Sequence, residues 1–171
     1  APGQSIDDLL AFLRPILFDP AVDAKKVSLD STKDLVTSSA VNFYDGVSQA
    51  EVERYYQGIV DPKDPTPVSY GLNSRLIKKA GKVVEEVYSL NGLYGPAIAK
   101  IVYWLEKASA VAESEAQKKV IDALVAYYKS GDLAQFDEYN VLWVKDLASL
   151  IDFVNGFIEV YNDPLGLKAT W

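Results

Sequence analysis

Three consecutive helical patterns between Pro96 and Leu147 constrain the fold more than any other feature of the sequence. Within each pattern, apolar residues recur every three or four positions, which places them on one face of a helix. Only a few residues separate one pattern from the next, and such short connections join helices that lie side by side and antiparallel. The sequence therefore predicts a core of antiparallel helices in this region.

Local signals predict where these helices begin and end. Proline suits a first helical position, a Ser or Asp followed three residues later by Gln is typical of a capping box, and glycine suits a helix end. The expected starts are Pro96, Ser114 with Gln117, and Asp132 with Gln135, and the expected stop of the second helix is Gly131. The expected buried stripe of the last helix consists of Phe136, Tyr139, Leu142, Trp143 and Leu147.

Two further helices are expected in the N-terminal half. Ser5 is a good N-cap, and the helix that it opens should decay between Pro15 and Pro20 because proline lacks a backbone donor. Ser48 with Glu51 forms a second capping box, which predicts a short helix. The three prolines of residues 61–67 then predict an irregular surface connection.

A β-hairpin is expected at about residues 68–88, where two β-prone stretches flank Gly81. The whole pattern predicts a mainly α fold with minor β (α+β): four or five antiparallel helices, this hairpin and a C-terminal extended segment. At 171 residues, with 49% hydrophobic residues, the chain is long enough for one core, so a single domain over residues 1–171 is expected.

Composition excludes several classes of function. The formal net charge is −7 and there is no basic run, whereas nucleic-acid binding requires clustered Lys and Arg. The chain has no cysteine, so no disulfide forms, and no apolar run reaches membrane-spanning length. A cytoplasmic protein that binds neither nucleic acid nor membrane is the expectation.

One stretch near the C-terminus has the character of a site. In residues 157–166 (FIEVYNDPLG), Glu159 and Tyr161 stand two positions apart and a turn follows. Side chains alternate faces along an extended strand, so Glu159 and Tyr161 should share one face with Phe157, while Ile158 and Val160 take the other. This spacing predicts a carboxylate and a phenol on the same wall.

The same stretch resembles a signature of the dipeptidyl peptidase III family of zinc exopeptidases, in its bacterial form. The similarity lies in residues 154–161 (VNGFIEVY) and 163–166 (DPLG), and it extends over most of the chain. The other similar stretches are residues 61–76, 100–105 and 136–146. The resemblance implies a partial chain that covers part of the lower, substrate-binding lobe of such an enzyme.

Two residue roles are implied by this resemblance. In the family, the glutamate of the motif receives the free α-amino group of the peptide, and the tyrosine two residues later donates a hydrogen bond to the carbonyl at the scissile bond. These roles fall on Glu159 and Tyr161. The distance between positions i and i+2 of an extended chain, about 7 Å, is similar to that between a peptide's amino terminus and the carbonyl that ends its first dipeptide.

The metal site of the family is missing from the sequence. Family members carry an H-E-x-x-G-H type zinc motif, and this chain has neither His nor Cys. The resemblance therefore implies the substrate-binding portion of an enzyme that releases dipeptides from peptide N-termini, inactive alone and without a cofactor of its own. Zinc belongs to the complete enzyme, and the missing lobe of that enzyme is an expected partner, along with the peptide substrate.

A second interpretation stays open. His, Cys and Met are all absent, a pattern that also fits an engineered or excised scaffold derived from that lobe, with a small-molecule or protein ligand. A stand-alone hydrolase is disfavoured, because a lone carboxylate has no second group to activate water. Exposed apolar surface on an isolated lobe would also favour a homo-oligomer.

Paired aromatic residues are expected to belong to the core rather than to a ligand platform, since aromatics at helical spacing usually pack inside. The pairs are Tyr55–Tyr56, Tyr103–Trp104 and Tyr127–Tyr128.

Overall fold

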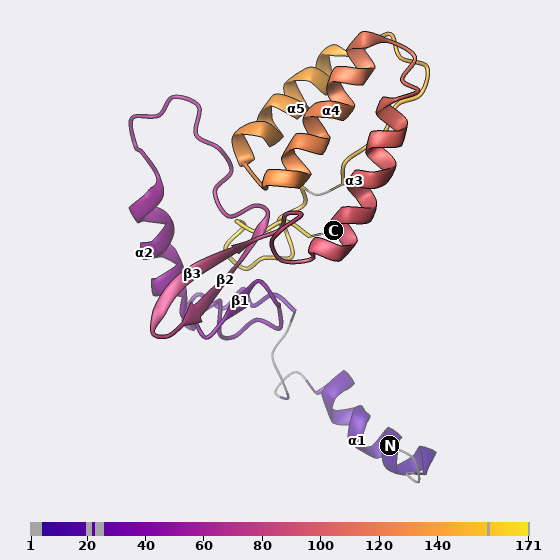
Figure 1. Cartoon of the computed structure of the whole chain (residues 1–171). Helices are drawn as coiled ribbons and strands as arrows, with labels where there is room; N and C mark the ends of the chain where they lie inside the picture. The colour runs from indigo at the N-terminus through magenta and orange to yellow at the C-terminus, as the bar shows by residue number, and fades with distance from the viewer. Residues whose placement is uncertain (1–4, 20–21, 23–25, 157, 171) are drawn as a thin grey trace.

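The computed structural model describes residues 5–19, 22, 26–156 and 158–170. Helices predominate, and a small sheet lies beside them, so the α+β class with minor β is confirmed (Figure 1). Two buried clusters form the core, one inside the helical bundle and one between the sheet and its neighbouring helix.

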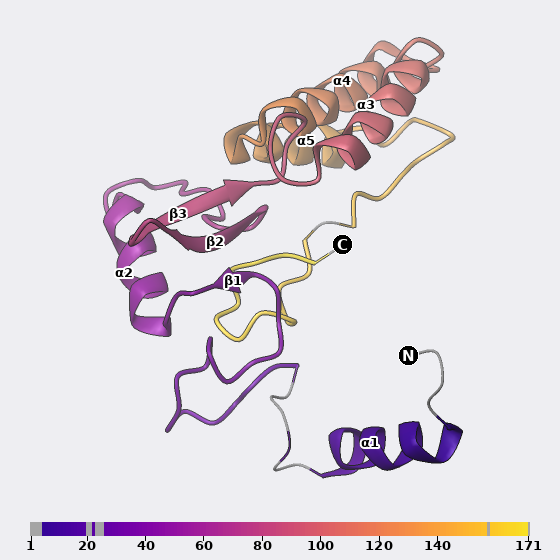
Figure 2. The same cartoon turned by 60° about the horizontal axis from the view of Figure 1, so that its bottom comes forward.

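The bundle consists of α3 (Gly95–Ser109), α4 (Glu115–Ser130) and α5 (Leu133–Lys145), which lie side by side in Figures 1 and 2. Direct contacts join α3 to α4 and α4 to α5, as the short connections predict. Among the described helices, these three form the antiparallel bundle, rather than the four or five that were expected. Their interior is filled by apolar and aromatic side chains, among them Ile98, Leu124, Tyr127, Phe136 and Tyr139.

The helix starts in the bundle are close to prediction, but the capping differs in detail. The Ser114 hydroxyl accepts a hydrogen bond from the Gln117 N–H, whereas the Gln117 amide oxygen accepts one from the Glu113 N–H. Only half of the expected capping box is therefore formed. The prediction of a buried Leu147 is wrong: α5 ends at Lys145, and Leu147 is 91% exposed.

The sheet has three strands in the order β1 (Tyr44–Asp45), β2 (Ser74–Lys79), β3 (Lys82–Val87). The antiparallel pair β2–β3 is the predicted hairpin, although regular pairing starts only at Ser74. Its turn residues, Ala80 and Gly81, both have positive φ, +50° and +78°, as a two-residue hairpin turn requires. The short parallel strand β1 is an addition that sequence patterns did not predict.

Helix α2 (Gln49–Ile59) begins at the expected capping box, in which Ser48 and Glu51 bind each other's backbone N–H groups. Its buried residues, Val52 and Tyr56, pack on Leu76 of β2 in the second core cluster. The C-terminal segment, yellow and beside β1 in Figure 2, contributes to both clusters, with Leu167 packed against this one and Ala169 in that of the bundle. This segment therefore connects the two parts of the core.

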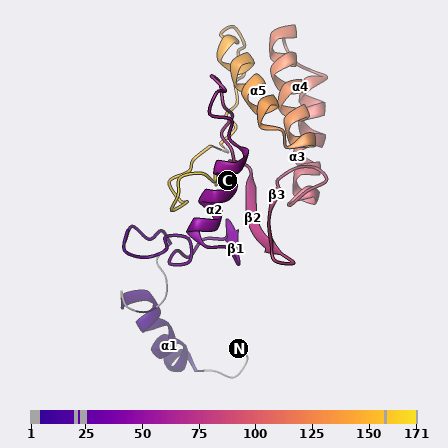
Figure 3. The same ribbon diagram turned by 90° about the vertical axis from the view of Figure 1, so that its left-hand side faces the viewer.

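Helix α1 (Ile6–Phe18) stands apart from the rest of the described chain (Figure 3). It begins at Ser5 and ends at Phe18, after Pro15, as predicted. Pro20 lies outside the described residues. None of the helix residues is buried, and several large apolar side chains are exposed: Ile6, Leu9, Leu10, Phe12, Leu17 and Phe18. None of the described helices combines the length and apolarity needed to cross a bilayer.

Candidate functional site

The segment that carries Glu159 and Tyr161 doubles back on itself. The chain reverses through residues 161–166, and residues 167–170 return alongside. The Thr170 N–H donates to the Glu159 carbonyl over 3.0 Å, and the Ala169 N–H donates to the Leu72 carbonyl over 2.9 Å. The returning stretch thus lies between Leu72, next to β2, and the backbone of Glu159.

The two faces of the segment have different surroundings. Ile158 and Val160 line a groove of about 600 Å³, whose other walls include Leu72 and, on α5, Phe136. Glu159 is exposed, and Tyr161 is 72% exposed. Val160 packs against the bundle core, whereas Ile158 lines the groove but is itself 54% exposed, so three of these four side chains are accessible to solvent. Phe157, expected beside them, lies outside the described residues.

A buried carboxylate holds the turn that follows the motif. Asp163 is 4% exposed, and its Oδ2 accepts hydrogen bonds from the N–H groups of Leu167 and Lys168, both over 2.8 Å. Its Oδ1 accepts a longer bond, 3.3 Å, from the Leu165 N–H. The Tyr44 hydroxyl also donates to Oδ2 over 2.8 Å. These four donors fix the turn against β1, and burial together with the Asp163 charge raises the pKa of Tyr44.

A fully buried ammonium lies next to this turn. Lys168 has no exposed surface, and its Nζ donates to the Tyr56 hydroxyl, to the Gly71 carbonyl over 3.2 Å and to the Ser74 hydroxyl over 3.1 Å. Both hydroxyls in turn donate to the carboxylate of Glu85. The lysine and the glutamate are therefore joined through two hydroxyl groups.

Burial lowers the pKa of Lys168 to about 8, and the nearby charges of Glu85 and Asp163 oppose that shift. The same surroundings raise the pKa of Tyr56, chiefly through burial and then through the charge of Glu85. At neutral pH the lysine is cationic and the tyrosine is neutral, which matches the donor and acceptor roles that the geometry gives them.

Sequence patterns did not identify this buried cluster. A lone lysine such as Lys168 ordinarily indicates exposed surface, and the sequence around Asp163 indicates only a turn. The one available signal is the dipeptide Asp-Pro, which favours a turn capped by the aspartate side chain. Asp61 and Asp64 also precede prolines, and each accepts a hydrogen bond from the N–H two residues later, as Asp163 does.

The residues described by the structure offer no group of three His, Cys, Asp or Glu side chains that could hold a metal ion. The sequence also contains no His or Cys, the ligands that zinc prefers. The donor set of this chain does not fit a catalytic zinc centre.

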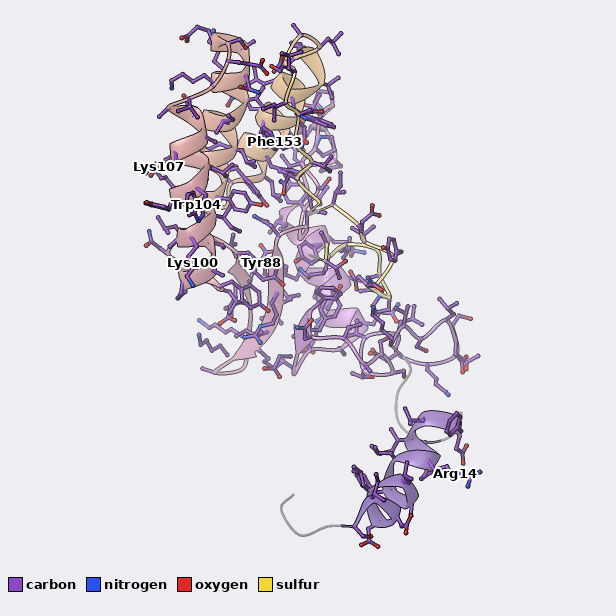
Figure 4. The ribbon with its side chains drawn as sticks, turned by 90° about the vertical axis from the view of Figure 1, so that its right-hand side faces the viewer. Arg14, Tyr88, Lys100, Trp104, Lys107 and Phe153 are labelled. Atoms are coloured by element: carbon purple, nitrogen blue, oxygen red, sulfur yellow. The ribbon has the colours of Figure 1, made fainter. Side chains whose placement is uncertain are left out.

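The aromatic pairs divide into two groups. Tyr56, Tyr127 and Tyr128 are buried, as expected of core residues. Tyr103 and Trp104 are not: they are 51% and 69% exposed, and Figure 4 shows Trp104 on the outer side of α3. The core prediction is wrong for this pair, because α3 packs on α4 through the face that carries Ile98 and Val102.

Comparison with known proteins points to one family. The family model described as peptidase family M49 matches residues 68–171, well over half of the chain. Dipeptidyl peptidase 3 of Rattus norvegicus is 32% identical over 78 residues, which are 46% of this chain and 11% of that protein. Dipeptidyl peptidase 3 of Dictyostelium discoideum is 26% identical over 141 residues, which are 73% of this chain and 20% of that protein.

A solved structure agrees with these matches. Dipeptidyl-peptidase III from Corallococcus sp. strain EGB has a TM-score of 0.53 and 22% sequence identity, over 75% of this chain and 23% of that one. At this identity the comparison shows a shared fold. The chain corresponds to no more than 23% of the length of any of these three proteins.

Proposed function

This chain belongs to peptidase family M49, and we propose that it supplies a substrate-binding wall to a dipeptidyl peptidase III-like zinc metallopeptidase, which releases dipeptides from peptide N-termini. In this proposal Glu159 receives the free α-ammonium of the peptide, and Tyr161 donates a hydrogen bond to the carbonyl oxygen at the scissile bond. The remainder of the protein completes the site.

The observation that carries the proposal is the exposure of Glu159 and Tyr161 on a segment whose backbone is hydrogen-bonded to the returning stretch, residues 167–170. The Thr170 N–H donates a hydrogen bond to the Glu159 carbonyl. Val160, between Glu159 and Tyr161 in the sequence, packs against the bundle core. A carboxylate held in this way is suited to an ammonium, because hydrogen bonds between opposite charges are stronger than neutral ones. A phenol is likewise suited to an oxygen on which negative charge develops.

The zinc-dependent steps are assigned in this proposal to other parts of the enzyme. In an M49 peptidase the metal would polarise the scissile carbonyl and activate water. Because this chain lacks a fitting donor set, those steps belong to the rest of the enzyme, and the chain alone is expected to bind peptide without cleaving it. What this chain contributes is the recognition of the amino terminus and a hydrogen-bond donor for the carbonyl.

Replacing the carboxylate tests this assignment. Glu159→Gln removes the charge and keeps the shape, so the affinity for tetra-alanine with a free amino terminus should fall about tenfold, as expected when a charge-assisted hydrogen bond is lost. Titration followed by amide chemical shifts of the ¹⁵N-labelled chain at neutral pH measures the affinity.

The matched control is Glu138→Gln, which changes an exposed carboxylate on α5 and should leave the affinity unchanged. Equal affinities of wild type and Glu159→Gln would refute the assignment. Tight binding of some other ligand without dependence on Glu159 would then favour the scaffold interpretation.

A further inference from the structure

We propose that Lys168 is a positioning residue: its buried ammonium holds residues 168–170 in place, and the backbone of Glu159 is hydrogen-bonded to that stretch. Lys168 would thereby fix where the side chains of Glu159 and Tyr161 stand. This inference rests on the proposed function, because it explains how that binding surface is kept in one geometry.

The ammonium is matched to its pocket. A lysine side chain has three N–H donors, and Lys168 has three acceptors: the Tyr56 hydroxyl on α2, the Gly71 carbonyl and the Ser74 hydroxyl at the start of β2. These acceptors come from two elements and the connection between them. The position of the Nζ atom is therefore defined in three directions.

The charge is compensated within the same cluster. Lys168 Nζ lies 3.9 Å from Glu85 Oε1, and the hydroxyls of Tyr56 and Ser74 bridge the two groups, at 2.7 and 2.5 Å from that oxygen. The ammonium also lies 4.7 Å from the centre of the Tyr56 ring and 5.8 Å from that of Tyr44. Every polar group that faces the lysine thus has a partner in the cluster.

Three consecutive residues connect this cluster to the motif. The Lys168 N–H donates to Asp163, the Ala169 N–H to the Leu72 carbonyl, and the Thr170 N–H to the Glu159 carbonyl. The Thr170 hydroxyl adds a second bond to the same carbonyl, over 3.3 Å. A displacement of residue 168 would therefore be transmitted along this short stretch to Glu159.

Stability alone does not account for a lysine at this position. Removing a charge from water is unfavourable, and buried ionic clusters replaced by apolar side chains of similar size often leave a fold as stable as before. What an apolar side chain cannot supply is three directed hydrogen bonds. We therefore attribute to the lysine the selection of one backbone conformation for residues 168–170.

Lys168→Met tests this role in the full chain, because methionine has a similar length and flexibility but no charge. Hydrogen exchange followed by NMR should show at least about a tenfold loss of protection at the Thr170 amide, while the Leu124 amide in α4 stays as protected as in wild type. Lys119→Met, which changes an exposed lysine on α4, is the control and should alter neither amide. Equal protection of Thr170 in Lys168→Met and wild type would overturn the proposal.

A second variant serves if Lys168→Met does not fold. Tyr56→Phe removes one acceptor of the ammonium and keeps the ring, and it should also lower the protection of Thr170. Tyr127→Phe, which removes a buried hydroxyl from the bundle core, is its control and should leave Thr170 protected. An unchanged Thr170 amide in Tyr56→Phe would count against the proposal.

Peptide affinity separates the two proposals. A folded Lys168→Met should bind free-amino tetra-alanine at least about fivefold more weakly than wild type, an effect that a merely stabilising residue would not have. Lost Thr170 protection with unchanged peptide affinity would overturn the positioning role. If Glu159→Gln binds as wild type does, the proposed function fails, whereas the exchange at Thr170 still reports whether Lys168 holds the segment.

Discussion

Gly71→Ala is expected to lower the free energy of unfolding by about 3 kcal/mol, the sum of a backbone penalty and a steric one. Gly71 has φ of +88°, a conformation that L-residues other than glycine rarely adopt. An added Cβ would lie 2.8 Å from both Cζ and Oη of Tyr56 and 3.1 Å from Nζ of Lys168. Both neighbours are buried and hydrogen-bonded to each other, so moving either one away from the added Cβ would disturb the cluster that supports the motif.

The control for this substitution is Gly81→Ala. Gly81 has a similar φ, +78°, but no atom lies within 4 Å of the added Cβ. Only the backbone penalty applies there, so the loss should be about 1 kcal/mol. Urea unfolding followed by circular dichroism measures both values. Equal losses in the two variants would show that the pocket around Lys168 is looser than the structure indicates.

Asp163→Ala is expected to reduce stability by about 4 kcal/mol, because it leaves one buried and three partly buried donors without their acceptor. These donors are the Tyr44 hydroxyl and the N–H groups of Leu165, Leu167 and Lys168. Since the turn after the motif depends on them, the loss should be accompanied by weaker protection of the Thr170 amide.

Asp61→Ala is the matched control for Asp163→Ala. Asp61 also precedes a proline and accepts a bond from the N–H two residues on, Lys63, but it is exposed. Its replacement should reduce stability by less than about 1 kcal/mol, because water can satisfy the freed donor. If the two variants lost the same stability, the burial of Asp163 would have no energetic consequence, contrary to the account given above.

Signals that act within a few residues predicted the fold well. The capping box of Ser48 with Glu51 forms at the start of α2, and Gly131 ends α4 with a positive φ of +75°. Gly81 lies in the hairpin turn as expected. In each case the same few residues supply both the pattern and the contact, so the sequence alone is sufficient.

Features that depend on distant parts of the chain were not predicted. Leu147 continues the apolar period of α5, but the helix ends before it, where the Asp146 N–H bonds to the Trp143 carbonyl. The exposure of Trp104 depends on which face of α3 packs on α4, and periodicity does not choose between two apolar faces.

The candidate site shows the same division. Alternation along an extended segment predicted that Ile158 and Val160 would both be separated from Glu159 and Tyr161, but the segment forms no strand, and of the apolar pair only Val160 packs against the core. The buried cluster next to the motif depends on a hydrogen bond between Lys168 and Tyr56, which are 112 positions apart in the chain. No local pattern marks such a contact, and only the folded chain brings these residues together.

The central claim is that the surface around Glu159 binds the free amino terminus of a peptide. The most direct test titrates the ¹⁵N-labelled chain with tetra-alanine and with N-acetyl-tetra-alanine, in which a neutral acetamide replaces the free ammonium. We expect at least about tenfold tighter binding of the free peptide, with the largest amide shifts within residues 158–170. Equal affinities for the two peptides, or shifts confined to other parts of the chain, would contradict this claim.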